Sequence, residues 1–359
     1  MYRNFKNIDK VVFGKGSFGE LDPILGPVRK LNDGFIVFVV DNYFKGRDLE
    51  GRIPVHSKDL VFFEDIDGHE PTTEQVDKIR DEVLNKKGLP SGVVGIGGGS
   101  ILDIAKALSL MLTNEGSSSL YQGLNLIKKP GVYHLGVPTI AGTGAECSMT
   151  AVLTGPEKKL GLKCDWTVFN QVILDPDLTV TVPRNQWFYT GMDCFIHCIE
   201  SESGIFYNEF SRAYGDQAIK LCREVFLGSS SGQDPLNNEK LMVASLFGGL
   251  SLSYSEVGVC HALSYGLSFV FGTRHGLANC IAFNQLHEYY GKAVGEFREM
   301  IRRHGIELPQ NLASKWSSSE LEKMADVAYR LPHMWTHALG YDWEKKITRN
   351  DIVELYRRM

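Results

Sequence analysis

Four side chains in the second half of the chain have the types and spacing of a metal site. Asp193 and His197 are four residues apart in a helical pattern, so both side chains leave the same face of that helix. His261 and His275 follow, fourteen residues apart, with the helix-breaking Gly272 between them. One carboxylate and three imidazoles could hold Fe²⁺ or Zn²⁺, with Mn²⁺ or Co²⁺ as alternatives, and keep an open position for substrate. Spacing alone leaves a structural role open for each histidine.

A glycine-rich segment in the first half could bind phosphate. Residues 95–100 (GIGGGS) follow a predicted strand and open a predicted helix, where glycines admit a close ligand and free N–H groups favour an anion. We expect Ser100 and Asp103 to form a capping pair at this helix start. Asp41, at the end of an earlier strand, could accept a hydrogen bond from a ribose hydroxyl or simply cap a turn. Because this acid precedes the glycine loop, the standard Rossmann order is not expected.

A second loop follows the next predicted strand. Residues 138–146 (PTIAGTGAE) combine small residues with the hydroxyl groups of Thr139 and Thr143. Either loop alone could reflect turn chemistry only. Two such loops at strand ends of one sheet favour a dinucleotide site.

The elements that would position these residues fall into two regions. Strand-forming runs at 35–40, 60–63, 92–96, 132–137 and 171–174 alternate with helical patterns that include 73–86 and 100–113. After Pro183 the pattern is helical throughout, at 184–201, 209–227, 238–255, 258–270, 276–290, 292–304, 318–330 and 350–358. We therefore predict an α/β dinucleotide-binding domain with a mostly parallel sheet over residues 1–182, and an all-α metal-binding domain over residues 183–359.

Composition narrows the function classes. The 359 residues carry a net charge of −5, without the basic excess typical of nucleic-acid binding. No apolar stretch approaches the ~20 residues of a membrane span, and the N-terminus shows no secretory signal. We expect a cytoplasmic protein that binds neither nucleic acid nor membrane.

Several polar and sulfur-bearing residues are expected to be structural. The seven cysteines are scattered, which does not suggest a disulfide framework, and Cys194 and Cys198 are interpreted as small core residues. The serine runs at 117–119, 229–231 and 317–319 are interpreted as loops or caps. The remaining histidines are His69, His134, His287, His304, His333 and His337.

The chain resembles the iron-containing, or group III, alcohol dehydrogenase family. The segments that carry the resemblance are GIGGGSILDIAKA (95–107), PTIAGTGAE (138–146), LDPDLTVTVP (174–183), TGMDCFIHCIE (190–200) and GVCHALSYGLSFVFGTRHG (258–276). They occur in family order and imply a cleft between the two domains that holds NAD and one divalent metal ion. The resemblance implies that the metal lowers the pKa of an alcohol and that its hydride passes to the nicotinamide.

The resemblance also assigns roles to individual residues. The implied metal ligands are Asp193, His197, His261 and His275, and the implied NAD-binding residues are Gly97, Gly98, Gly99, Ser100, Thr139 and Thr143. Asp103, in the predicted helix that follows the glycine loop, is a further candidate NAD-binding residue. Asp41 falls where a negative charge would repel the extra phosphate of NADP. Lys106 and Lys163 could balance cofactor charge or be solvated surface residues.

Two positions depart from the family pattern and bear on the substrate. Tyr265 stands where members often carry a histidine proposed to relay protons, and Arg274 replaces a common proline before the last ligand. Both are candidate catalytic residues; Arg274 could bind an anionic substrate or be a helix-terminal surface residue. The chain further resembles the subgroup that oxidises the terminal primary alcohol of the sugar acid 3-deoxy-D-manno-octulosonate (Kdo), towards an 8-amino sugar for lipopolysaccharide.

Other functions remain open at the level of sequence. A short-chain alcohol or aldehyde dehydrogenase is the nearest alternative, and a dehydroquinate synthase-type lyase shares the implied architecture. A metal- and nucleotide-binding protein without activity is a third alternative, which retention of all four implied ligands argues against. The expected partner is a small-molecule alcohol or sugar acid, with a homodimer as one possible assembly.

Overall fold

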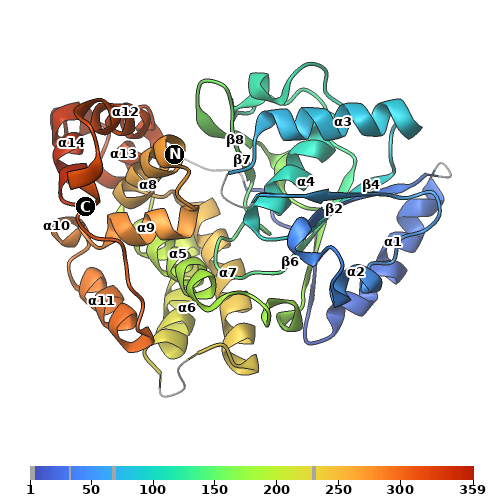
Figure 1. Ribbon diagram of the computed structural model, residues 1–359, viewed down its shortest axis with the longest axis horizontal. Coiled ribbons are helices and arrows are strands. Elements are labelled where there is room, and N and C mark those ends of the chain that lie inside the picture. Colours follow the sequence, from blue (N-terminus) through green and yellow to red (C-terminus); the bar gives the residue numbers. More distant parts are fainter. Residues whose placement is uncertain (1–4, 32–33, 67–69, 229–231) are drawn as a thin grey trace. The chain divides into compact units, whose positions relative to one another are not determined.

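The computed structural model describes residues 5–31, 34–66, 70–228 and 232–359. His69 and the serine run 229–231, both interpreted above as structural, lie outside these ranges. The chain divides into two compact units (Figure 1). The first contains the described residues up to Ile140 together with Ala145–Thr181, and the second contains Ala141–Gly144 and Val182–Met359.

The first unit is built on a parallel sheet of six strands in the order β1-β9-β6-β4-β2-β3. The strands are β1 (Lys10–Phe13), β2 (Ile36–Asp41), β3 (Leu60–Glu64), β4 (Gly92–Gly97), β6 (Tyr133–Pro138) and β9 (Gln171–Leu174). Every pair of neighbours is parallel, as the alternation of strands and helices predicted. Strand β1 was not predicted, because it is a four-residue edge strand whose Val11 and Phe13 are exposed.

Helices cover both faces of this sheet (Figure 1). They are α1 (Leu21–Lys30), α2 (Asp48–Arg52), α3 (Thr73–Lys87) and α4 (Gly99–Met111). Side chains alternate along a strand, so Val37 and Val39 of β2 pack in the core cluster with α3 and α4. Phe38 and Val40 point to the opposite face and join the cluster that contains residues of α1. Burial on both faces explains why β2 is a continuous apolar run in the sequence.

A second, three-stranded sheet lies in the same unit and was not predicted. Its strands, in the order β5-β8-β7, are β5 (Gly123–Leu124), β7 (Thr150–Thr154) and β8 (Lys159–Lys163). Strands β7 and β8 pair antiparallel. Both are short and interrupted by Thr, Gly or Lys, which hides them from a search for apolar runs.

The second unit is helical, and its described residues contain no strand. Its helices are α5 (Arg184–Ser203), α6 (Glu209–Phe226), α7 (Pro235–Tyr254), α8 (Val259–Phe271), α9 (His275–Phe283), α10 (His287–Tyr290), α11 (Lys292–His304), α12 (Ser318–Tyr329), α13 (Pro332–Leu339) and α14 (Arg349–Arg357). The predicted helix 276–290 is in fact two helices, α9 and α10, and α13 was not predicted. The short 3-10 helices of the chain include η1 (Ser17–Glu20), η3 (Asn42–Phe44), η4 (Ser118–Tyr121), η5 (Asp165–Thr167), η6 (Pro176–Thr179), η7 (Leu312–Lys315) and η8 (Trp343–Lys345).

Local signals fix the helices that carry the candidate ligands. Helix α5 begins directly after Pro183, and α8 ends at Gly272, which adopts a left-handed conformation with φ 66°. The loop segment 141–144 belongs to this unit. Its Gly142 lies so close to α5 that an added Cβ atom would be 1.8 Å from the carbonyl oxygen of Thr190. Only glycine permits that approach.

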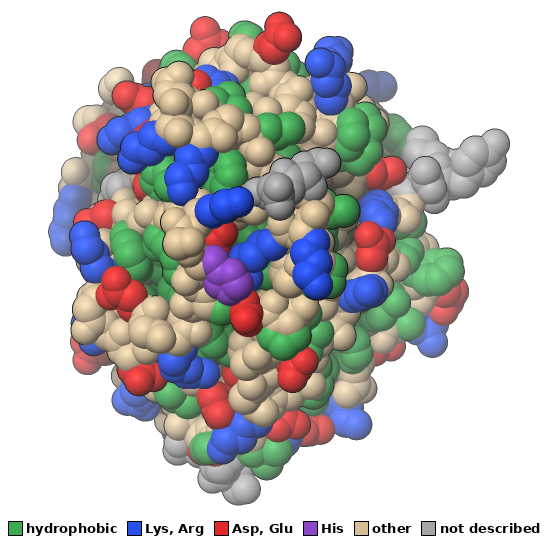
Figure 2. Space-filling model, turned by 90° about the vertical axis from the view of Figure 1, so that its right-hand side faces the viewer, with side chains coloured by type: hydrophobic (Ala, Val, Ile, Leu, Met, Phe, Trp, Pro, Cys, Tyr) green, Lys and Arg blue, Asp and Glu red, His purple; other side chains and the backbone are tan. Residues whose placement is uncertain are grey.

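Side chains of both charge signs lie on the surface, and the cysteines are buried. Lys and Arg side chains alternate with Asp and Glu on the face in Figure 2. All seven cysteines are buried free thiols. No single described helix is long and apolar enough to cross a bilayer; α7 and α8 reach that length and hydropathy only as a pair, bent by 105°.

Candidate active-site residues

Helix α5 carries three acidic or imidazole side chains on one buried face. Asp193, His197 and Glu200 are spaced i, i+4 and i+7, so they follow one another along two turns. His261 lies in the first turn of α8, and His275 is the first residue of α9. The turn around Gly272 separates these two helices and thereby places two imidazoles near the same stretch of α5.

Asp193, His261 and His275 form a compact cluster of potential ligand atoms, all within 4.8 Å of one another. Oδ1 of Asp193 lies 3.3 Å from Nε2 of His261 and 3.6 Å from Nε2 of His275. Ligands about 2.1 Å from a tetrahedral ion are about 3.4 Å apart, so these separations fit a shared cation.

The amide nitrogen of Asn279 lies at the centre of this cluster. It is 2.6 Å from Oδ1 of Asp193 and 3.2 Å from Nε2 of both His261 and His275. An amide has two N–H groups, which cannot serve three acceptors at once. A divalent cation would satisfy all three, and so the donor set fits a metal ion.

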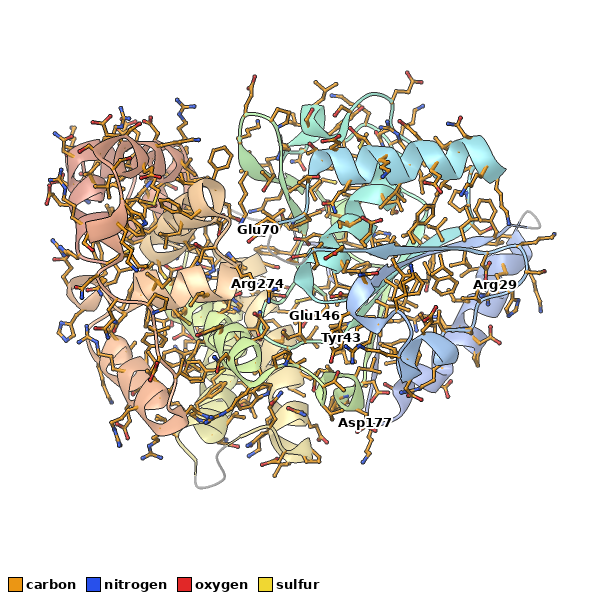
Figure 3. All side chains as sticks on the ribbon, viewed as in Figure 1. Arg29, Tyr43, Glu70, Glu146, Asp177 and Arg274 are labelled. Atoms are coloured by element: carbon orange, nitrogen blue, oxygen red, sulfur yellow. The ribbon has the colours of Figure 1, made fainter. Side chains whose placement is uncertain are left out.

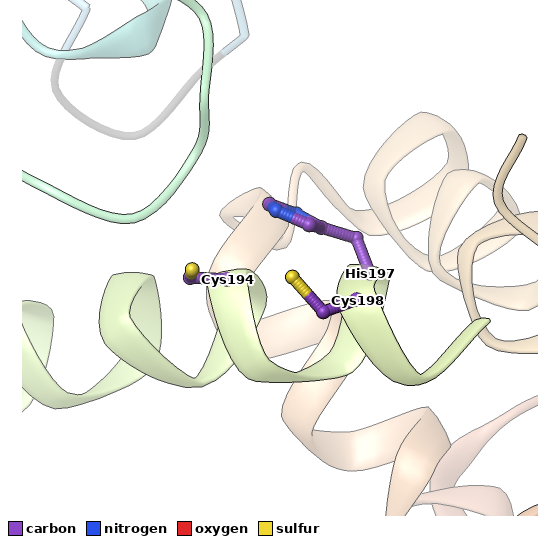
Figure 4. Close-up of side chains that lie close together, drawn as sticks. All are labelled: Cys194, His197 and Cys198. Carbon is purple, nitrogen blue, oxygen red and sulfur yellow. The ribbon is translucent and has the colours of Figure 1, made fainter. Parts of the chain in front are cut away.

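His197 is placed differently from the other three predicted ligands. Its ring centroid lies 6.3 Å from that of His261, and its Nε2 is buried without a hydrogen-bond partner among the described residues. The sulfur atoms of Cys194 and Cys198 come within 4.8 Å of a nitrogen of this ring (Figure 4). An unsatisfied buried polar atom costs about 1–3 kcal/mol, a cost that a bound ion would relieve.

Burial and mutual charge set the protonation of the cluster. Burial opposes ionisation of Asp193, yet the neighbouring His275, His261 and His197 hold its pKa well below the ordinary value. Burial lowers the pKa of His197 to about 4, which leaves the ring neutral with a free lone pair. For His261 burial acts in the same direction, but the carboxylates of Glu200 and Asp193 outweigh it and raise the pKa to about 9.

The two candidate catalytic residues differ in exposure. Tyr265 is buried, and its ring meets that of His275 edge-on, with centroids 6.2 Å apart and an interplanar angle of 80°. Arg274, labelled in Figure 3, occupies the N-cap position of α9. Its side chain is exposed. Tyr265 therefore lies against a predicted ligand, whereas Arg274 precedes one in a helix-terminal position.

In the first unit, the predicted dinucleotide-binding residues gather at the carboxyl ends of three adjacent strands. Asp41 ends β2, Gly97 ends β4, and Thr139 directly follows β6. Strand β4 pairs with both β2 and β6, and the Thr139 N–H donates to the carbonyl of Gly97. The chain order reverses between β2 and β4, and such switch points are where open α/β sheets bind ligands.

The glycines and Ser100 lie where the loop prediction placed them. Gly98 is the N-cap of α4, and Gly99 and Ser100 begin the helix. A Cβ atom on Gly97 would lie 2.7 Å from Ile101, so this glycine also permits close packing of strand and helix. Thr143 belongs to the segment that packs in the second unit.

One prediction about this region was wrong, and one of the two alternatives left open for Lys106 is excluded. The helix start has no side-chain cap, because Asp103 instead accepts a hydrogen bond from the backbone N–H of Val152 at 3.0 Å. Lys106 is not a surface residue: it is fully buried and donates to the backbone carbonyls of Ser148 and Thr150. The Asp41 carboxylate does cap a turn, accepting from the N–H of Tyr43, a role the sequence had left open.

Sequence reasoning missed three residues of the candidate metal-ligand cluster and its surroundings. Asn279 lies at its centre, while Glu200 and the hydroxyl group of Tyr290 support His261 from behind. The spacing of Glu200, seven residues after Asp193, was a usable signal. Asn279, one turn after His275, was a second; Tyr290 gave none.

Comparisons with known proteins place these features in one family. The model "Iron-containing alcohol dehydrogenase" matches residues 9–176, and "Fe-containing alcohol dehydrogenase family, C-terminal" matches residues 187–338. Sulfoacetaldehyde reductase of Bilophila wadsworthia (strain 3_1_6) is 33% identical over 189 residues, 52% of this chain and 49% of the relative. NAD-dependent methanol dehydrogenase of Bacillus methanolicus is 33% identical over 192 residues, 53% and 50%. The matches thus span about half the length of these curated relatives.

A solved structure shows the same fold. Sulfoacetaldehyde reductase from Bifidobacterium kashiwanohense, in complex with NAD⁺, superimposes with a TM-score of 0.81 at 21% identity. The superposition covers 99% of this chain and 98% of the other. With two consecutive family models across most of its length, the chain belongs to the iron-containing alcohol dehydrogenase family.

Proposed function

We propose that this protein is an NAD- and metal-dependent oxidoreductase that oxidises a primary alcohol to an aldehyde. The observation that carries the proposal is the convergence of Asp193, His261 and His275 on one point, with separations suited to a single cation. Family membership supports NAD as the hydride acceptor.

In this proposal Asp193, His197, His261 and His275 hold Fe²⁺ or Zn²⁺, or Mn²⁺ or Co²⁺. A divalent cation bound there would supply the electrostatic stabilisation that lets an alcohol lose its proton near neutral pH, and NAD would accept the hydride. The part of these four residues is to bind the cation and fix its position. The ionised Asp193 and the neutral His197 offer lone pairs without first losing a proton.

For NAD, the proposed binding residues line the carboxyl ends of β2, β4 and β6. The first turn of α4, at Gly98, Gly99 and Ser100, offers backbone N–H groups to the pyrophosphate. Asp41 would accept from a ribose hydroxyl and repel the additional phosphate of NADP. Asp103, Thr139 and Thr143 complete the proposed set.

The proposed substrate is an acidic sugar. Arg274 supplies an exposed cation one residue before His275, so it could bind a carboxylate next to the ligand cluster. One relative is named for sulfoacetaldehyde, an anionic aldehyde. We therefore place Kdo first among the substrates, with its C8 hydroxyl group oxidised on the way to an 8-amino sugar for lipopolysaccharide.

The test is reconstitution of metal-free protein with Fe²⁺, Zn²⁺, Co²⁺ or Mn²⁺, followed by NAD and a panel of alcohols that includes Kdo. We expect metal-dependent NADH formation, fastest with the sugar acid. NADH formation with simple alcohols only would support a short-chain dehydrogenase and overturn the substrate assignment. Turnover with NAD recycled and no net NADH would favour a lyase, and binding of NAD and metal without oxidation of any alcohol would overturn the proposed activity.

A further inference from the structure

Glu200 is a fully buried carboxylate that lies behind His261. Its Oε2 lies 2.5 Å from Nδ1 of His261, on the opposite side of the ring from the nitrogen that faces Asp193. Its Oε1 accepts two further hydrogen bonds, from the backbone N–H of Cys260 at 2.7 Å and from the hydroxyl group of Tyr290 at 2.6 Å. Three helices, α5, α8 and α10, thus meet at one carboxylate.

All three neighbours of Glu200 act as donors. The Cys260 N–H can only donate, and the Tyr290 hydroxyl group already accepts from the N–H of Val259 at 3.1 Å, so its proton is free for Glu200. Nδ1 of His261 must then carry a proton to bond with the remaining carboxylate oxygen. In a neutral ring this leaves the lone pair on Nε2, the nitrogen that faces Asp193 and Asn279.

We propose that Glu200 is a positioning residue that holds His261 in its metal-binding tautomer and orientation, and that Tyr290 in turn holds Glu200. The inference rests on the proposed function, since it gives His261 a metal ion to bind. Metal-bound histidines commonly donate their second ring N–H to a carboxylate, which fixes the ring and makes it a stronger ligand.

A role in stability alone would explain this arrangement less well. Burial of a carboxylate beside an imidazole costs desolvation energy, and apolar residues of similar volume often stabilise a core equally or better. The arrangement also fixes the orientation that metal binding by His261 needs. Glu200 contacts Nδ1 of the ring, and so Nε2 is directed towards Asp193, the other candidate ligand.

Glu200→Gln separates the two roles because glutamine keeps the shape but offers only one accepting oxygen. If that oxygen faces Cys260 and Tyr290, the amide N–H₂ faces Nδ1 of His261 and forces it to accept. The ring proton then moves to Nε2 and blocks the lone pair needed for a metal ion. The opposite orientation directs the amide donors at two other donors.

The experiment titrates metal-free protein with Co²⁺ and follows its visible absorption, with affinity measured by competition against a chelator. We expect wild-type protein to bind one Co²⁺ and Glu200→Gln to bind it about 10- to 100-fold more weakly. Glu202→Gln is the matched control on the same helix, half-buried and without contact to His261, and it should bind as wild type does. Nitrogen NMR of histidine-labelled, metal-free protein, recorded above the His261 pKa of about 9 so that the ring is neutral, should show its proton on Nδ1 in wild type and on Nε2 in Glu200→Gln.

Tyr290→Phe provides a second variant that keeps the carboxylate. It removes one donor to Oε1 and should weaken Co²⁺ binding several-fold without moving the His261 proton, which tests the inference even where Glu200→Gln fails to fold. Wild-type protein that binds no Co²⁺ would overturn the proposed metal site itself. Wild-type binding that both variants match, or an unchanged tautomer in Glu200→Gln, would overturn the role of Glu200 and leave the metal site standing.

Discussion

Lys106 and Asp103 lie one turn apart on α4, with Nζ of the lysine 3.6 Å from Oδ1 of the aspartate, and both bind the same strand edge. Lys106 donates to the carbonyls of Ser148 and Thr150, at 3.0 and 2.9 Å, and Asp103 accepts from the N–H of Val152. Among the described strands, β7 pairs only with β8, and one isolated bridge joins its last residue, Thr154, to Thr72. The two side chains therefore satisfy alternate backbone groups as a neighbouring strand would, and they tie the helix of the glycine loop to the small sheet.

We expect Lys106→Met to destabilise the protein by on the order of 3 kcal/mol, because it removes the donor of one buried and one partly buried carbonyl and leaves Asp103 without its cation. Urea unfolding would measure the loss, with the exposed Lys78→Met on α3 as the control. Asp103→Asn combined with Lys106→Met should cost less than the sum of the single changes. A Lys106→Met protein within about 0.5 kcal/mol of wild type would contradict the proposed edge pairing.

The burial of Lys106 shows where sequence reasoning stops. Its helix was predicted from apolar spacing, and the structure agrees over Gly99–Met111. The oxygens that accept from its ammonium group are more than 40 residues away in sequence, at the start of a strand and just before it, and that strand is too short and polar to be recognised. Periodicity reports which residues share a face, but not which distant backbone groups that face meets.

The candidate ligand cluster was likewise predicted only in part from local sequence patterns. The four-residue spacing correctly put Asp193 and His197 on one face of a helix, and the break at Gly272 was also predicted. That His261 and His275 meet Asp193 depends on packing between helices, and only the family resemblance anticipated it. His197 lies four residues after Asp193 on that face, yet a nitrogen of its ring is within 4.8 Å of the sulfur atoms of Cys194 and Cys198. The spacing did not indicate this contact.

The position of His197 gives a direct test of which atoms bind metal. We expect His197→Ala to lower Co²⁺ affinity by more than about 100-fold, since it removes a ligand rather than a supporting residue. Cys198→Ala should retain wild-type affinity, because the proposed site uses no thiol. Chelator competition on the three proteins decides between them, and a matching loss in Cys198→Ala would mean that sulfur binds the ion.

Asp41→Asn should shift cofactor preference towards NADP. The amide can still accept from the Tyr43 N–H, so the turn is preserved while the charge that repels the 2′-phosphate is removed. We expect the ratio of kcat/KM for NADP to that for NAD to rise about tenfold or more, from the loss of one close charge repulsion. Initial rates with both cofactors measure it. An unchanged ratio in a folded variant would mean that Asp41 only caps the turn.

Arg274→Ala should discriminate between acidic and neutral substrates. If the guanidinium group binds the substrate carboxylate, KM for a sugar acid should rise by about tenfold or more while KM for a neutral alcohol stays constant, as expected when a charge-assisted hydrogen bond of 1.5–3 kcal/mol is lost. Arg274→Lys keeps the charge, so its KM for the sugar acid should lie between those of wild type and Arg274→Ala. Equal changes for both substrate classes would show that Arg274 is a helix-terminal surface residue.

Glu202 predicts a pH dependence of stability on α5. Burial raises its pKa from 4.5 to about 7, and its Oε1 has no hydrogen-bond partner among the described residues. Between these pH values the folded protein holds a proton that the unfolded chain has released, so stability falls as pH rises from 4.5 to 7 and stays lower above that range. Glu202→Gln removes this loss.

At pH 8 the variant should therefore have a free energy of unfolding higher than that of wild type by on the order of 1 kcal/mol, once solvent screening is allowed for, and should unfold at a higher temperature. At pH 4.5 the two proteins should unfold at nearly the same temperature. Thermal unfolding at the two pH values measures the difference, and Glu239→Gln, exposed on α7, is the matched control. A stabilisation equal at both pH values would mean that the effect comes from packing of the amide. No stabilisation at pH 8 would mean that the Glu202 carboxylate is solvated when ionised.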